Sequence, residues 1–575
     1  MAGIYGTFLK DESKETNGLG QFLSKLEVQD ELAVFGGTVG RRTISKLPGD
    51  RVFETIDEVT ICLEGANLNE TDNLGEYLMH RYSKYGIKGI EELKGTFSGF
   101  LFDSNLKKIY LFNDHLSTKN IFYYYDKEHG FLFASELAAI SKFLRLAEIP
   151  FSLDRDGVYM MALYGFLLDD KTYLEEVKKL PYSTILTYNI VENTLAIERT
   201  YSYAAEKINP TYNEAISSIN DLMEKSVSRC WSKSQNDTSS HLALLSGGMD
   251  ARTNIVIARD LGFKGIKSLT FGQSNSKDIQ YAQEIAIGEN LDHYQRILDY
   301  PTYLTENILE NLVRPNDGLI MFHSSAHTST TVRSLNLSNH SVLHTGQIGD
   351  ALFGSFTKSD YDFHKNRGNI GYTGFISEGA LLDKISILPE IIEKYNDLGL
   401  ELFTYEQRII NATLYGDRSL NNHIDNISPF FDRDLLSYCI SLPNSFKKDQ
   451  QIYFDWLRKH HGRAIEYSWD KINMIPNSRW KIRYGKRFKK LSNGARKYFN
   501  YNYESMNPYG TWVKKFPVLM ETMDTVFYTE INRSYIDSEL RTDLTAIYQK
   551  NIFEYRNKFA VLTALLAMRL HLETE

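Results

Sequence analysis

One apolar run of the chain ends in two adjacent glycines and an acidic residue, a pattern that can bind a phosphorylated ligand. Residues 244–252 read Leu-Leu-Ser-Gly-Gly-Met-Asp-Ala-Arg. Adjacent glycines let the backbone turn sharply and bring its N–H groups close to a ligand. Such N–H groups and the start of a helix attract anions, so phosphate or pyrophosphate is the natural occupant. We expect this ligand to contact Leu245, Ser246, Gly247 and Gly248.

The acid that follows the glycines, Asp250, places negative charge beside the expected phosphate, which is favourable if the carboxylate holds Mg²⁺. The lysine of the phosphate-loop pattern GxxxxGK(S/T) is absent. Residues 341–354 repeat the arrangement, with an apolar run, a glycine loop that contains Gly346, and then Asp350. Loops at the carboxyl ends of parallel strands converge on one crevice. We therefore expect Asp250 and Asp350 to share the metal ion.

Strands and helices that alternate along the chain must position these two loops. The apolar runs 241–245, 266–271 and 341–345 read as strands, and helical patterns lie between them. This order is typical of a doubly wound parallel sheet, an α/β fold. From about residue 375 the pattern is mainly helical. We assign residues 211–575 to this second domain.

The first 200 residues have a different pattern and form a first domain, residues 1–200. Runs of aromatic and β-branched residues, separated by turn signals, predict strands in stacked sheets. The predicted strands are residues 3–9, 32–37, 59–63, 98–103, 109–112, 121–125 and 131–134. Helical spacing appears over residues 74–85. This domain is therefore α+β, with antiparallel sheets packed as a sandwich.

The motifs of both domains, taken in order, resemble one family. Residues 246–250 resemble the SGGxDS loop of the N-type ATP pyrophosphatases, and residues 346–354 resemble the GEGxDExFGG loop of the asparagine synthetases. Further segments that resemble the asparagine synthetases are residues 1–4 (its MCGI start), 93–97 (LxGxFAF), 113–116 (RDxxG), 133–137 (FASExK), and 417–419 with 429–432 (DRxSM…RxPFLD). The resemblance covers nearly the whole chain.

The resemblance implies an N-terminal-nucleophile-like glutaminase domain followed by an ATP pyrophosphatase domain. Such a synthetase adenylates a carboxylate with ATP, and ammonia then attacks the acyl-adenylate to give an amide. ATP and Mg²⁺ are the implied cofactors, because a metal ion and an anion nest stabilise departing pyrophosphate. Lys471 stands roughly where the family has a lysine that contacts the α-phosphate. Asp278 is expected near the pyrophosphate, and Phe271 could pack on adenine or belong to the core.

The first domain departs from the family at the residues that would hydrolyse glutamine. Ala2 stands where the family has its cysteine nucleophile, and a methyl group cannot attack an amide. Glu64 occupies the oxyanion segment next to Gly65, and its carboxylate would repel a developing oxyanion. Arg42 and Asp72 still align with the glutamine-binding residues. We interpret this as a degenerate glutaminase site, with either natural loss of the cysteine or an engineered replacement left open.

The second domain departs from the motifs of the family at fewer functional positions than the first domain. Ala251 replaces a serine, Ala351 replaces an acid, and Gln347 stands where asparagine synthetases have Glu and β-lactam synthetases have a catalytic Tyr. Glutamine does not titrate, so Gln347 can orient a substrate amine but cannot act as a general base. Both proposed metal ligands remain.

These observations favour an ATP-dependent ligase that forms an amide from a carboxylate and either ammonia or a substrate amine. Loss of glutaminase chemistry is shared with β-lactam synthetases and lasso-peptide cyclases. The substrate is then a small-molecule, peptide or glycan carboxylate. Two alternatives stay open: a glutamine-hydrolysing asparagine synthetase whose cysteine has been replaced by Ala2, and a catalytically degenerate nucleotide-binding homologue.

The composition of the chain excludes several other classes of protein. The net charge of −8 argues against a protein that coats nucleic acid. Three scattered cysteines exclude a disulfide framework and fit a reducing cytoplasm. No signal peptide is recognisable, and the longest apolar stretch, residues 559–568, is too short to span a bilayer. Nine cations between residues 479 and 497 are either a solvated helix face or a docking surface for an anionic partner. A homodimer is left open.

Overall fold

The computed structural model describes most of the chain. The described residues are 3–11, 18–204, 206–233, 240–357, 361–373, 379–485, 489, 506–550 and 554–573. Ala2 and most of the cationic stretch lie outside them.

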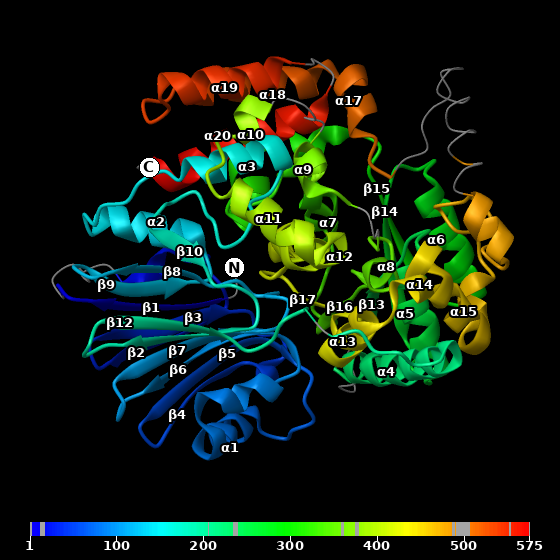
Figure 1. Cartoon of the computed structure of the whole chain (residues 1–575), viewed down its shortest axis with the longest axis horizontal. Coiled ribbons are helices and arrows are strands. Elements are labelled where there is room, and N and C mark those ends of the chain that lie inside the picture. The colour runs from blue at the N-terminus through cyan, green and yellow to red at the C-terminus, as the bar shows by residue number, and fades with distance from the viewer. Residues whose placement is uncertain are drawn as a thin grey trace.

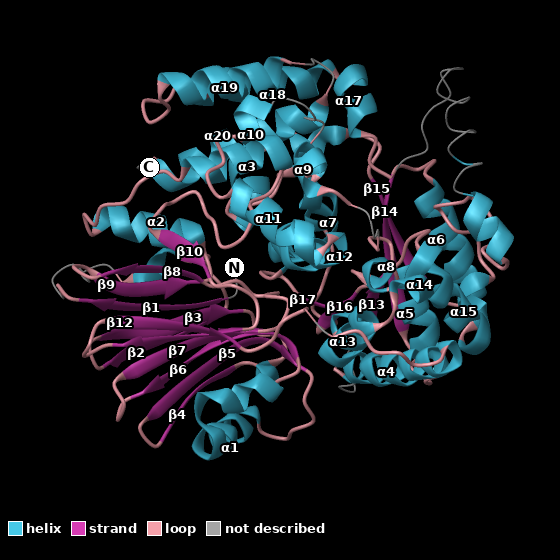
Figure 2. Cartoon of the chain, viewed as in Figure 1, coloured by secondary structure: helices cyan, strands magenta, loops and turns pink. Residues whose placement is uncertain are grey.

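The N-terminal part consists of two six-stranded antiparallel sheets packed face to face (Figures 1 and 2). The strand orders are β10-β8-β9-β1-β3-β2 and β12-β11-β7-β6-β5-β4. The strands are β1 (Gly3–Leu9), β2 (Val28–Val34), β3 (Gly37–Thr43), β4 (Val52–Ile56), β5 (Val59–Asn67), β6 (Gly95–Asp103), β7 (Lys108–Asn113), β8 (Phe122–Asp126), β9 (Gly130–Ala134), β10 (Val177–Lys179), β11 (Thr184–Asn189) and β12 (Thr194–Arg199). Buried aromatic side chains such as Phe8, Phe100 and Phe133 fill the space between the sheets. The predicted sandwich is confirmed.

Helices cover the outer faces of this sandwich. Helix α1 (Leu74–Tyr85) packs on β4 and β5, and α2 (Leu137–Leu146) packs on β8 and β9. The bounds of α1 match the predicted helix. The predicted strand 32–37 is wrong as a single run, because the chain turns between β2 and β3 and Gly36 adopts φ 74°. The turn needs a left-handed residue that glycine supplies without strain.

The second part is built on a parallel sheet of order β15-β14-β13-β16-β17, with helices on both faces. Its strands are β13 (His241–Leu244), β14 (Ile266–Gly272), β15 (Asp292–Ile297), β16 (Val342–His344) and β17 (Asp425–Ile427). Its principal helices are α4 (Tyr212–Ser232), α5 (Met249–Asp260), α6 (Lys277–Gly288) and α7 (His323–Arg333). Ala243 packs toward α4 and α5, and its neighbour Leu242 packs toward α7. The predicted doubly wound sheet is confirmed.

The remainder is mainly helical, as predicted, apart from β17, whose three residues are too few to show a strand period. The helices are α8 (Gly349–Leu352), α9 (Phe363–Asn366), α10 (Gly379–Leu382), α11 (Leu388–Leu398), α12 (Leu400–Phe403), α13 (Arg433–Ser441), α14 (Asn444–Lys447), α15 (Gln451–His460), α17 (Tyr509–Lys515), α18 (Pro517–Glu530), α19 (Ser538–Gln549) and α20 (Tyr555–Leu572). The N-terminal part also contains α3 (Arg155–Tyr164).

Helix α20 connects the two parts of the molecule (Figure 1). It packs on α2 and α3 of the N-terminal part and on α18 and α19 of the C-terminal part. Every residue from Asn557 to Met568 is buried. The longest apolar stretch of the sequence is therefore a core helix. None of the helices in the described ranges is long and apolar enough to cross a bilayer.

Candidate functional site

The two glycine loops meet where the strand order of the parallel sheet reverses, between β13 and β16. Open α/β sheets bind ligands at this point, outside the carboxyl ends of the strands. A Cβ on Gly346 would lie 2.3 Å from the backbone N of Ala251, and a Cβ on Gly349 would lie 2.7 Å from the carboxyl carbon of Asp250. Only glycine permits this approach, so the loops are packed directly against each other.

The first loop is fixed by backbone and arginine contacts. The backbone N–H of Leu245 bonds to Leu269 at 2.9 Å, and the N–H of Gly248 bonds to the hydroxyl of Ser246 at 3.2 Å. The buried guanidinium of Arg252 donates to the carbonyl oxygens of Gly247 and Gly248 at 2.8 and 2.9 Å. These bonds occupy the carbonyl oxygens of the loop.

The two aspartates of the loops lie together. The carboxylate of Asp250 accepts the backbone N–H of Asp350 at 2.9 Å and the hydroxyl of Tyr453 at 2.9 Å. The ammonium of Lys471 contacts the carboxylate of Asp350 at 3.0 Å. Burial and repulsion by Asp350 raise the pKa of Asp250. Burial opposes the charged form of Lys471, but both carboxylates outweigh this effect and raise its pKa.

The donor set of this pair fits Mg²⁺. Two carboxylates that repel each other in a buried setting gain from a shared cation, and Mg²⁺ is held in proteins by one or two carboxylates together with phosphate oxygens and water. The part of the chain that is described contains no cluster of three or more His, Cys, Asp or Glu with metal-binding geometry. Asp250 and Asp350 would therefore hold the ion together with the phosphates of a nucleotide.

Asp278 and Phe271 lie on neighbouring elements. Asp278 is in the first turn of α6, where burial raises its pKa to about 6 and the N–H of Gly247 partly offsets this. Phe271, near the end of β14, is 9% exposed and its ring lies 5.1 Å from that of His327. The structure thus brings Asp278 to the glycine loop and places Phe271 in the core.

A cavity of about 590 Å³ opens beside the second loop, and we call it the Gln347 cavity. Its polar lining residues include Gln347, Asp417, His323, His327, Tyr372 and Arg556. The amide N–H of Gln347 donates to the carboxylate of Asp417 at 2.8 Å, and Asn426 donates to the other carboxylate oxygen. Burial raises the pKa of Asp417 to about 7. A carboxylate with this pKa can accept a proton from an amine near neutral pH.

Three residues of this site carried no role in the sequence interpretation. Asp417 belongs to a segment noted only for its resemblance. Its partner Gln347 is 70 residues away, and its partner Asn426 lies nine residues further on in β17, a strand that the sequence does not reveal. Arg252 follows the glycines by four residues, so its spacing in the first turns of a helix was an available signal. Tyr453 comes from α15, and no local pattern indicates its contact with Asp250.

The positions of the degenerate glutaminase site are spread over the first sandwich. Arg42 is buried in β3, Gly65 is in β5, and Asp72 is exposed in the loop before α1. Ala2 lies outside the described residues.

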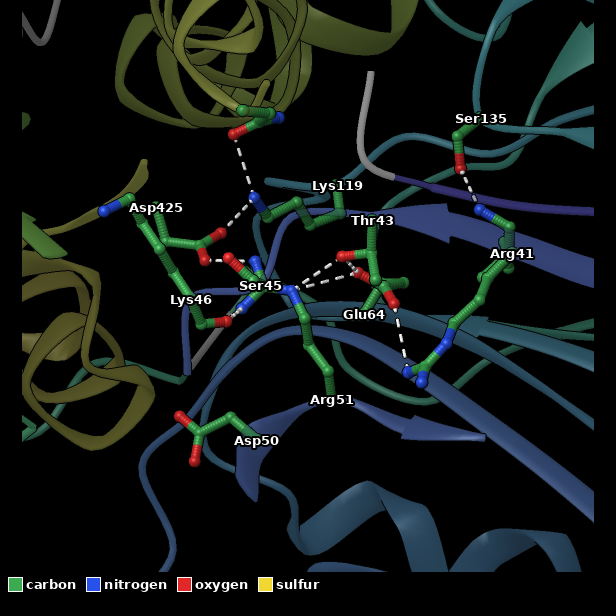
Figure 3. A network of polar contacts seen from close by, with 12 residues as sticks. Arg41, Thr43, Ser45, Lys46, Asp50, Arg51, Glu64, Lys119, Ser135 and Asp425 are labelled. Atoms are coloured by element: carbon green, nitrogen blue, oxygen red, sulfur yellow. Dashed lines mark hydrogen bonds and ion pairs between the residues drawn. The ribbon is translucent and has the colours of Figure 1, made fainter. Parts of the chain in front are cut away.

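Glu64 is tied into the junction between the two parts of the molecule (Figure 3). Its carboxylate contacts the guanidinium groups of Arg51 and Arg41 at 3.3 and 3.4 Å and accepts the hydroxyl of Thr43 at 2.7 Å. The guanidinium of Arg51 also forms an ion pair with Asp425 at the start of β17. These side chains form a buried ionic network around Glu64, the residue that precedes Gly65 in β5.

The cationic stretch is only partly described. Arg479 pairs with Asp455, and Lys489 donates to the carbonyl oxygen of Asp470. The docking surface stays a prediction.

Comparison with known proteins shows which proteins this chain is similar to. Residues 63–202 match the glutamine amidotransferase domain family. The asparagine synthetase (glutamine-hydrolysing) 2 of Bacillus subtilis strain 168 is 23% identical over 459 residues, which cover 70% of this chain and 58% of that protein. A protein of Methanocaldococcus jannaschii, also named as an asparagine synthetase (glutamine-hydrolysing), is 21% identical over 387 residues, covering 66% of this chain and 61% of that protein. The chain thus spans about three fifths of the length of these relatives.

Among solved structures, glutamine phosphoribosylpyrophosphate amidotransferase from Bacillus subtilis, complexed with ADP and GMP, matches 49% of this chain and 79% of its own. The identity is 9% and the TM-score 0.25, so this likeness carries no argument about activity. The N-terminal part thus matches the glutamine amidotransferase domain family, and 70% of the chain is similar to an asparagine synthetase.

Proposed function

We propose that the protein is an ATP-dependent ligase that adenylates a carboxylate, releases pyrophosphate, and joins the acyl group to ammonia or an amine. The observation that supports this most strongly is the position of the Asp250, Asp350 and Lys471 cluster. It lies at the reversal point of the sheet, and the adjacent loop also lines the Gln347 cavity. A nucleotide and a carboxylate substrate could therefore bind side by side.

Each residue of the cluster has a distinct part in this reaction. The glycine loop at the start of α5 would bind the departing pyrophosphate. Asp250 and Asp350 would hold Mg²⁺, which would neutralise charge on the phosphates. The ammonium of Lys471, 3.0 Å from the carboxylate of Asp350, would contact the α-phosphate and stabilise the charge that develops during adenylation.

The second step needs a proton acceptor, because an amine is mostly protonated at neutral pH and must lose a proton to attack. Gln347 cannot supply this function, but Asp417 can, since its pKa of about 7 suits proton transfer at that pH. Gln347 acts as a positioning residue by holding the carboxylate of Asp417. In total, one carboxylate, one ATP and one molecule of ammonia or amine are consumed, and one amide, one AMP and one pyrophosphate are produced, with the proton lost by the nitrogen passing to Asp417.

The products of the reaction test this proposal. The protein is incubated with MgATP, an ammonium salt, and a panel of amino-acid, peptide and uronic-acid carboxylates. We expect equal amounts of AMP and pyrophosphate with at least one carboxylate, and no activity when glutamine replaces ammonium. Formation of ADP and phosphate would refute adenylation.

A matched pair of variants ties the activity to the site. Asp250→Asn should lower pyrophosphate release by at least ~10²-fold, because it removes a charge that holds the metal ion. Asp221→Asn, on the exposed face of α4, makes the same chemical change and should leave the rate unaltered.

A further inference from the structure

A second large cavity lies between the two parts of the molecule, and we call it the junction cavity. Its volume is about 640 Å³. One wall comes from the loop after β3, residues 44–48, and the other from residues 332–341 and from Asn422 and His423. Residues 340–341 and 422–423 precede β16 and β17, so this cavity is at the amino-terminal edge of the parallel sheet. The Gln347 cavity and the glycine loops are at the opposite edge.

The lining of the junction cavity carries more positive than negative groups. The basic lining residues are Lys46, Arg333, His340 and His423, and the one acidic lining residue is Glu27. Glu27 already accepts the backbone N–H of Ser45 at 2.9 Å. Asp425, a buried acid whose charge acts on Lys46, is ion-paired with Arg51 and Lys119 (Figure 3).

Lys46 and Arg333, the two cations of the cavity, bond to neutral oxygen atoms. The ammonium of Lys46 donates to the carbonyl oxygens of Leu337 and His340 at 2.6 and 2.8 Å. Arg333 donates to the amide oxygen of Asn311 at 3.3 Å. Neither makes an ion pair with an acid in the described part of the chain. Burial lowers the pKa of Lys46, although the charges of Glu27 and Asp425 partly offset this effect. Burial and then the positive charge of Arg333 lower the pKa of His423.

Two further features point to an organic ligand. The amide oxygen of Asn422 is buried and has no hydrogen-bond partner among the described residues. A buried polar group without a partner is costly, and a ligand in the cavity would satisfy it, with either end of the amide facing inward. Apolar side chains cover the rest of the wall; they include Ile44, Leu47, Val332 and Leu335.

We propose that the junction cavity binds a small organic dianion, a dicarboxylate or a phosphate monoester, through Lys46, Arg333, His423 and Asn422. The charged groups of the ligand would face the cations, and its carbon skeleton would pack on the apolar wall. None of the degenerate glutaminase positions Arg42, Gly65 and Asp72 lines this cavity.

One segment links this site to the proposed reaction. Gly416 and Asp417 line the Gln347 cavity, and Asn422 and His423 line the junction cavity. Asn426, just beyond them, donates to the carboxylate of Asp417. A ligand that fixes residues 422–423 therefore acts on the segment that holds Asp417. This link to turnover rests on the proposed function, whereas the binding itself does not.

Calorimetry on the full chain tests the binding without ATP or substrate. Succinate and glycerol 3-phosphate are titrated separately, with sodium chloride at matched ionic strength as the reference. We expect at least one of them to bind, and the stronger ligand identifies the preferred anion. Binding should persist with saturating MgATP. The absence of binding by both dianions, or its loss with MgATP, would overturn the proposal.

Variants locate the site. Arg333→Gln and His423→Gln should each weaken binding roughly tenfold, because each removes a charge-assisted hydrogen bond to the anion. Arg296→Gln removes the same charge from exposed β15 and should have no effect. Equal weakening by Arg296→Gln would show nonspecific ionic binding and contradict the proposal. These results stand whether or not the protein forms AMP.

Discussion

At the scale of single residues, the Gln347 cavity contains one carboxylate, that of Asp417, whose pKa lies near neutral pH. Two amide N–H groups, from Gln347 and Asn426, donate to Asp417 and favour its ionised form, whereas burial opposes ionisation more strongly. The resulting pKa of about 7 is well above that of an exposed aspartate. In the proposed reaction, a base of this strength would deprotonate the attacking amine.

The pH dependence of the second step follows from this. The base form of Asp417 predominates above its pKa, so the kcat/KM for the amine should rise with pH through about 7. Asp417→Asn keeps the shape of the side chain but cannot accept the proton, and it should lower amide formation by ~10²–10⁴-fold and remove this rise. Exchange of labelled pyrophosphate into ATP should be retained, because adenylation precedes the proton transfer. Equal loss of exchange and amide formation would assign Asp417 a structural role instead.

At the scale of elements, the decisive feature is the direct contact between two strand-to-helix loops. Gly346 and Gly349 let the second loop press against the start of α5, and this brings Asp350 to Asp250. Backbone packing between the two loops therefore sets the positions of the two aspartate side chains.

Substitution of one glycine should therefore separate the loops. In Gly346→Ala the new methyl group would meet the backbone of Ala251, which cannot move away as a flexible side chain would. We expect a loss of about 1–3 kcal/mol in the free energy of unfolding and strongly weakened MgATP binding. Gly462→Ala is the control, since a Cβ there meets no atom within 4 Å. Thermal unfolding with and without MgATP measures both effects, and unchanged MgATP binding in Gly346→Ala would contradict this account.

The sequence predicts those helices and strands whose residue pattern lies within the element itself. The α1 bounds, the antiparallel sandwich and the doubly wound sheet follow from periodicity and order, and the meeting of Asp250 with Asp350 follows from the geometry of parallel strands. Strand β17 was missed because it is only three residues long and is defined by pairing with β16. Asp417 was missed because its pKa depends on burial and on partners that only tertiary packing brings near.

At the scale of the whole molecule, the two parts share buried charges. Asp425 at the start of β17 pairs with Arg51 and Lys119 of the N-terminal part, and Arg51 also contacts Glu64 (Figure 3). Burial alone would raise the pKa of Asp425, but Arg51 and Lys119 lower it below the usual range. The carboxylate is therefore ionised in the folded protein at any pH near neutral.

Removal of this charge should destabilise the junction. Asp425→Asn would leave Arg51 and Lys119 buried without their shared anion, and breaking a buried pair in this way costs about 3–5 kcal/mol. Asp434→Asn breaks the exposed pair with Lys94, which also joins the two parts, and should cost at most about 1 kcal/mol. Chemical denaturation of both variants measures the difference. Equal effects of the two substitutions would show that burial of the junction contributes little.

The position of α20 has a consequence for synthesis on the ribosome. The apolar faces of α2 and α3 are covered by a helix that begins about 400 residues after α2 ends. At ~5–20 residues per second, the growing chain waits on the order of 20–80 s before that cover is made. During this interval the N-terminal sheets can pair, yet one side of their helical layer faces water. A nascent chain in this state is a natural client for chaperones that bind exposed apolar surface.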